Sequence, residues 1–198
     1  MFSNKANYIF DEVLLTNHVP EIIELFKNNF LDYCKKLKRI EYLSNLCVIL
    51  ESKESISKYY WININDTNFP FVGVIEHTNF VNKKNYNNTN LIYLSKYLPS
   101  NDKIYKMKKE AIFKFTIKAI KKKFPQFNIK NILKYHIWRA DYAQPITTIN
   151  YKNIIPKFNT PIKNVYISTM AQIYPEDRGT NQAVKHGIEN AKKIINNI

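Results

Sequence analysis

The chain has 198 residues, a length that suits one domain or a large part of one, and its 45% hydrophobic content is enough to bury a core. Thirty Lys and Arg against sixteen Asp and Glu give a net charge of +14, a balance that suggests polyanionic partners such as nucleic acid. The basic residues are spread along the chain without arginine clusters or a known nucleic-acid motif, so we favour compositional bias over a binding patch.

Two cysteines, Cys34 and Cys47, lie in apolar or helical surroundings, which is typical of reduced thiols in an intracellular protein. Neither belongs to a metal-ligand spacing, so no metal site is predicted. Residues 1–8 do not combine a basic region with an apolar stretch, and no apolar run is long enough to span a bilayer. We therefore expect a cytoplasmic protein.

The first predicted elements are a strand and two helices. Residues 8–16 read as a strand, and Pro20 stands where a helix is expected to start, because its missing amide hydrogen has no partner there in any case. Apolar residues at helical spacing continue the first helix, and a second helical run passes through Leu37. These residues are expected to pack, and none is assigned any chemistry.

Alternating apolar residues then predict a series of strands, at residues 46–50, 60–64, 69–75 and 91–97. Glu76 and His77 follow the third of these strands. A carboxylate beside an imidazole can serve as an acid–base pair, but neighbours in a strand point to opposite faces. Two interpretations of His77 stay open, as a functional residue or as a hydrogen-bonded structural one.

Residues 100–124 are predicted to form one long helix, with Ser100 as its cap and lysines around most of its surface. Pro125 ends the helix, and residues 131–144 return to a strand. Trp138 and Tyr142 share one face of this strand, where they either line a ligand pocket or fill a core.

The C-terminal part reads as a strand at residues 164–169, a loop, and a helix from Thr180 onward with apolar residues at helical spacing. The loop carries Glu176, Asp177, Arg178 and Gly179 directly before the helix. The first amides of a helix have no partner within it, so they point at whatever occupies such a loop. This arrangement outlines a site for an anion or another polar ligand.

Several stretches resemble the second half of FAD-dependent amine oxidases and protoporphyrinogen oxidase-like flavoproteins, in the same order along the chain. The resemblance covers about residues 8–198. It rests on Tyr60-Trp61, Phe69-Pro70-Phe71, Glu76-His77-Thr78-Asn79-Phe80, Tyr93-Leu94-Ser95-Lys96-Tyr97, Arg139-Ala140-Asp141-Tyr142-Ala143-Gln144-Pro145 and Ile173-Tyr174-Pro175-Glu176-Asp177-Arg178-Gly179-Thr180-Asn181-Gln182-Ala183-Val184.

The resemblance implies an α+β fold with a mixed, mainly antiparallel sheet of the substrate-domain type, packed helices and a C-terminal strand–loop–helix unit that contacts flavin. It treats residues 1–198 as a single unit, the substrate-binding and C-terminal FAD-contacting part of such an enzyme. It implies FAD contacts by Tyr174, Asp177, Arg178, Gly179, Thr180 and Asn181, and a substrate pocket that includes Trp138, Tyr142 and His77. No residue is assigned to catalysis.

The Rossmann half that carries the Gly-x-Gly-x-x-Gly turn of such enzymes is absent from this sequence. Its three glycines, Gly73, Gly179 and Gly187, lie too far apart to form that turn. FAD binding and any activity on a small-molecule substrate are therefore expected to need another polypeptide, or a preceding part of the gene, that carries the dinucleotide-binding half.

Two alternatives stay open. Met170-Ala171-Gln172 replaces the Gly-Glu or Gly-Asp that usually precedes the flavin loop, which leaves the ribose contacts undefined. The segment also resembles UDP-galactopyranose mutase, whose flavin site ends in a loop with Arg, Tyr and Asp, so a redox-neutral reaction on a sugar nucleotide is the alternative enzyme class. The other alternative is a non-enzymatic basic module of the same fold that binds nucleic acid or an acidic partner through its lysines.

Overall fold

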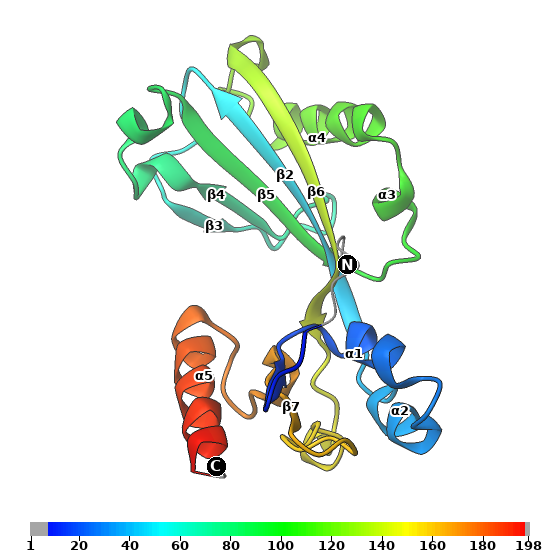
Figure 1. Ribbon diagram of the computed structural model, residues 1–198. Coiled ribbons are helices and arrows are strands. Elements are labelled where there is room, and N and C mark those ends of the chain that lie inside the picture. Colours follow the sequence, from blue (N-terminus) through cyan, green and yellow to red (C-terminus); the bar gives the residue numbers. More distant parts are fainter. Residues whose placement is uncertain (1–7, 197–198) are drawn as a thin grey trace. The chain divides into compact units, whose positions relative to one another are not determined.

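The computed structural model describes residues 8–196, which divide into two compact units (Figure 1). One unit combines residues 8–41 with residues 145–196, and the other consists of residues 42–144. The expectations for residues 1–7 and 197–198 lie outside the described part. The sequence did not predict this division, and the correspondence of residues 1–198 to a single functional unit stays a prediction.

Residues 42–144 form a five-stranded sheet in the order β3-β4-β5-β2-β6. The strands are β2 Tyr42–Ser52, β3 Trp61–Asn63, β4 Gly73–Glu76, β5 Asn90–Leu98 and β6 Ile132–Pro145. Pairing is antiparallel between β3 and β4, β4 and β5, and β5 and β2. The α+β class with a mainly antiparallel sheet is thereby confirmed.

The alternation along β2 and β5 determines which face of this sheet is covered. Leu46, Val48 and Leu50 on β2 are fully buried, as are Ile92 and Leu94 on β5. They share a core with Ile112 and Ile120 of helix α4, Lys109–Lys123. The intervening residues, such as Cys47 and Tyr93, are only partly buried and lie on the opposite face.

The prediction of a single helix over residues 100–124 is wrong. The chain forms a short helix α3, Lys103–Lys106, capped by the side chain of Asp102 rather than Ser100, and then α4. Met107 and Lys108 between them are extended, with ψ angles of 152°. Arg139 of β6 explains this break, because its Nε donates to the Tyr105 carbonyl at 2.7 Å and its Nη2 to the Met107 carbonyl at 2.6 Å.

The other unit is built around a two-stranded parallel sheet of β1, Val13–Leu15, and β7, Val165–Ile167. Both strands are shorter than the patterns at residues 8–16 and 164–169 predicted. Asn164 adopts a left-handed conformation with φ of 63°, and the Thr169 side chain caps a 3₁₀ helix at Met170–Gln172, so neither residue continues β7.

Three helices complete this unit, α1 Val19–Phe26, α2 Leu31–Leu37 and α5 Thr180–Ile195. Pro20 stands in the first turn of α1, as predicted. A 3₁₀ turn lies at Tyr151–Asn153 in this unit, and the unit of residues 42–144 has 3₁₀ turns at His77–Asn79, Lys83–Tyr86 and Ile129–Asn131. No helix within residues 8–196 is both long and apolar enough to cross a membrane.

Candidate functional site

The predicted flavin-contacting loop lies between the 3₁₀ helix Met170–Gln172 and α5, as the strand–loop–helix pattern predicted. Gly179 is the N-cap of α5, so no side chain of the cap residue occupies the first amides of the helix. A Cβ at this position would stand 2.6 Å from Oδ1 of Asn181, which shows how closely that amide side chain covers the cap. The first turn of α5 carries no acidic residue, so no side chain within that turn compensates the positive end of the helix dipole.

Tyr174 and Arg178 both lie near the buried Tyr151. The Tyr151 ring lies 5.6 Å from the Tyr174 ring, and its hydroxyl donates to the Ala171 carbonyl at 2.8 Å. Burial raises the pKa of Tyr151, whereas the charge of Arg178 opposes that shift, which places Arg178 within electrostatic reach of this phenol. The backbone N–H of Arg178 donates to Oδ1 of Asp177 at 2.8 Å. The structure thus brings Tyr174, Asp177 and Arg178 onto one short segment before α5.

A polar cavity of about 220 Å³ adjoins the loop. Its walls come from residues 172–176 and from the first three turns of α5, with Tyr174, Glu176, His186 and Glu189 among them. This cavity could not be predicted, because nothing in the sequence indicates that Gln172 and His186 meet.

His186 belongs to a polar network beneath the loop. Its Nε2 lies 3.2 Å from Oε1 of Gln172 and 3.0 Å from Nδ2 of Asn190. The Asn190 amide also donates to Oγ of Ser168 at 2.9 Å, and Asn190 is almost completely buried. Burial, reinforced by the charge of Lys193 and opposed by Glu189, lowers the pKa of His186 below 6.5.

The predicted pocket residues Trp138, Tyr142 and His77 all belong to the other unit. Trp138 lies on β6 with its side chain 63% exposed, and Tyr142 on the same strand packs edge-on against Tyr42 at 5.7 Å. Their parity places them opposite the buried Ile137, on the sheet face that α4 does not cover. Neither residue therefore fills the core.

His77 lies in the 3₁₀ turn that follows β4. Its Nε2 is 2.8 Å from the Tyr86 hydroxyl, and its ring packs edge-on against Tyr93 at 5.7 Å. Glu76 points into the core instead, where its carboxylate accepts hydrogen bonds from the Ile56 amide and the Thr78 hydroxyl. Since β5 and β2 separate β4 from β6, roughly 14 Å of sheet lies between the strand before His77 and the strand of Trp138.

No cluster of three or more His, Cys, Asp or Glu side chains within residues 8–196 is arranged to hold a metal ion. The polar groups that gather at the C-terminal loop are phenols, amides, one guanidinium and the first amides of a helix, together with the carboxylates of Glu176 and Asp177. Such donors suit a polar or anionic organic ligand.

Comparisons with known proteins give a match in structure but none in sequence. No family model and no curated protein matches the sequence. Two crystal structures, of a protein assigned as a protoporphyrinogen oxidase from Exiguobacterium sp. 255-15 and of an oxidoreductase from Methanosarcina mazei, each superpose on 94% of the chain with a TM-score of 0.68. Their sequence identities are 12% and 15%, respectively. Reduced UDP-galactopyranose mutase matches 74% of the chain with a TM-score of 0.57 and 12% identity.

The chain spans only 41%, 43% and 32% of these three proteins, respectively. The first two matches each cover 94% of the chain, so the similarity includes residues of both of its units. The chain therefore has the fold of part of a protoporphyrinogen oxidase-like flavoprotein oxidoreductase.

Proposed function

We propose that the chain is the C-terminal portion of an FAD-dependent, amine oxidase-like oxidoreductase, either as a split subunit or as a truncated form. In this role residues 174–181 complete the flavin site, and the open face of the five-stranded sheet shapes the substrate pocket. The fold match over about two fifths of flavoprotein oxidoreductases supports this proposal.

The observation that carries the proposal is the direction in which α5 presents its apolar residues. Val184, Ile188 and Ile195 share one side of the helix and are 58%, 52% and 68% exposed. The side that packs inward instead carries His186 and the buried Asn190. An amphipathic helix normally buries its apolar side, so this arrangement calls for a covering polypeptide.

The β1–β7 pair supports the same conclusion. Parallel strands occur almost only inside larger sheets whose two faces are covered, yet this parallel sheet has two strands in the part of the chain described. Val13 of β1 is also exposed. A dinucleotide-binding half with its own parallel strands and helices has the architecture to extend this sheet and to cover α5.

The residues around the loop fit FAD in chemical type. Arg178 and the amides of Gly179, Thr180 and Asn181 offer donors to the flavin or its ribityl chain, and the Tyr174 ring offers a flat apolar surface. Trp138, Tyr142 and His77 would shape the cavity for a small substrate. When bound, the flavin itself supplies hydride transfer, so the chain contributes binding, orientation and exclusion of water.

The proposal is tested by isolating the tagged chain from its native cells and recording the visible spectrum and the polypeptides that accompany it. A flavin spectrum is expected together with a polypeptide sequence that carries the missing glycine turn. A variant with Val184→Ser and Ile188→Ser should lose both the flavin and that polypeptide, because it makes the uncovered side of α5 polar.

The matched control is Leu25→Ser, which removes an equally exposed apolar side chain from α1. A colourless preparation without a partner would contradict the proposal. Unchanged flavin and partner in the α5 variant would show that this helix is not the covered surface.

A UDP-galactopyranose mutase-like role is the second candidate, and the third fold match favours it. In that case the assembled protein would rearrange a sugar nucleotide without net oxidation. Turnover of UDP-galactopyranose in the presence of a reductant, with no amine oxidised and no peroxide formed, would select this candidate over the first.

We place the protein in the cytoplasm as part of the same proposal. Both cysteines are free thiols, Cys34 buried and Cys47 partly buried, as suits a reducing compartment. Burial raises the pKa of Cys47 to about 11, so this thiol is protonated and unreactive at neutral pH.

A further inference from the structure

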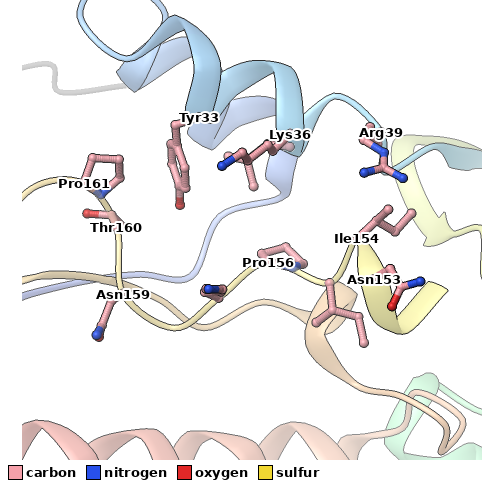
Figure 2. Close-up of a pocket in the computed structure, with 12 residues that line it drawn as sticks. Tyr33, Lys36, Arg39, Asn153, Ile154, Pro156, Asn159, Thr160 and Pro161 are labelled. Carbon is pink, nitrogen blue, oxygen red and sulfur yellow. The ribbon is translucent and has the colours of Figure 1, made fainter. Parts of the chain in front are cut away.

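A second cavity, of about 460 Å³, lies between α2 and the segment at residues 153–161, away from the loop before α5 (Figure 2). Its size falls in the range of about 300–1,000 Å³ that is usual for small-molecule sites. Leu37, Ile154 and Pro156 form apolar parts of the wall. Figure 2 shows the side chains of Tyr33, Lys36 and Arg39 extending from α2 and the residues after it toward this segment.

The Tyr33 hydroxyl is the most unusual group at this cavity. It is buried, and it has no hydrogen-bond partner among the residues that the structure describes. Burial, followed by the effect of the neighbouring Cys34, raises the pKa of Tyr33 to about 12, so the phenol keeps its proton at neutral pH. A buried donor without an acceptor is costly, and a ligand oxygen at this wall would remove that cost.

The charged groups at the cavity have one sign. Lys36, Arg39 and Lys157 line it, and no Asp or Glu stands among the residues of its wall. The adjacent Lys35 is different, because its Nζ pairs with Oδ1 of Asp32 at 3.0 Å and it does not line the cavity. Three cations with a protonated phenol form a set of donors that selects an acceptor-rich anion.

From this geometry we propose that the cavity between α2 and residues 153–161 binds a small organic phosphate. A phosphate dianion matches a wall with several positive charges better than a single carboxylate does, and Arg and Lys are the usual partners of phosphate. The apolar wall accommodates the organic part of the ligand. This site is independent of the proposed flavin site, since it shares no residue with the loop at 174–181.

Phenyl phosphate is the probe for this site, because it combines a dianion with a flat apolar body. Isothermal titration of the full chain at an ionic strength of about 0.15 M should show saturable binding of one equivalent. Tyr33→Phe and Lys36→Gln should each weaken that binding by about tenfold, since each removes one hydrogen bond to a charged group.

Lys35→Gln is the control, because it removes the same charge from the neighbouring position without touching the cavity. It should leave binding unchanged, and no variant should unfold at a lower temperature than the parent. Equal losses in Lys35→Gln and Lys36→Gln would show attraction by net charge alone and would overturn the proposal. Absence of phenyl phosphate binding, or benzoate binding of equal strength, would also contradict it.

Discussion

At the scale of single residues, Arg178 offers the sharpest test of the flavin loop. It follows Asp177, whose carboxylate accepts a hydrogen bond from the Arg178 backbone N–H, and it precedes Gly179, the N-cap of α5. We predict that Arg178→Ala weakens flavin retention in the assembled enzyme by about tenfold, since it removes a charged donor from the site. Flavin absorbance per protein after gel filtration measures this effect.

The control for that variant is Lys192→Ala, which removes one positive charge from an exposed position far along α5. It should retain flavin as the parent does. If Arg178→Ala keeps full occupancy and an unshifted flavin spectrum, the assignment of Arg178 to the site is wrong.

The lowered pKa of His186 predicts that the stability of the protein depends on pH. Its pKa in the folded protein lies below the ordinary 6.5, so the unfolded chain binds more protons just below pH 6.5. The free energy of unfolding should therefore fall as the pH drops from 6.5 through the lowered pKa. Urea unfolding at several pH values, compared with His186→Gln, should show a shallower decline in the variant.

His18→Gln is the corresponding control, because His18 lies exposed at the start of α1, where it pairs with Glu21. An identical pH dependence in the parent and in His186→Gln would mean that the buried network does not hold the imidazole neutral. The network itself could not be predicted from the sequence, since it depends on hydrogen bonds that join Ser168 and Gln172 to His186 and Asn190 across the fold.

At the scale of elements, Arg139 determines where a helix ends. Its guanidinium donates to the carbonyls of Tyr105 and Met107, and it lies 5.9 Å from the Tyr105 ring. We predict that Arg139→Ala lowers the free energy of unfolding by about 1–3 kcal/mol, because two carbonyls lose a charged donor. Urea denaturation followed by far-UV circular dichroism measures the change.

Arg139→Lys should recover only part of this loss, because an ammonium group cannot reproduce the forked geometry of the guanidinium. Full recovery in the lysine variant would show that charge alone is required. A loss no larger than that of Lys118→Ala on α4 would show that Arg139 contributes nothing specific.

Elements with strong local patterns were predicted from sequence, and elements set by distant contacts were not. The alternation of apolar and polar residues predicted β2 and β5. The strand–loop–helix order at the C-terminus was predictable because the apolar spacing of its strand and helix is a local feature. The break between α3 and α4 was missed because it depends on Arg139, more than thirty residues further on. The apolar residues of α5 were recognised, but their exposure was not, since spacing identifies a helix face without saying what covers it.

At the scale of the whole molecule, the net charge of +14 raises the choice between an enzyme part and a basic binding module. The salt dependence of binding distinguishes the two. If the chain is a basic module that binds nucleic acid through its lysines, its affinity for a single-stranded oligonucleotide should be measurable at about 50 mM salt and fall steeply by about 200 mM. Flavin retention should change little over that range, because the proposed flavin site lies at a helix start and not on an open charged surface. Affinity for nucleic acid that survives high salt, or that is absent at low salt, would rule out the basic module.

The parallel pairing of β1 with β7 joins strands that are made at very different times during translation. At about 5–20 residues per second, roughly 8–30 s pass between synthesis of Leu15 and that of Val165. Residues 42–144 are complete before β7 exists, and the Glu41 carbonyl accepts a hydrogen bond from the Ile146 amide at 2.9 Å, so the two connections lie side by side. The unit with the five-stranded sheet can therefore fold first, during translation. Until β7 has been synthesised, the apolar β1 has no strand partner and is accessible to chaperones.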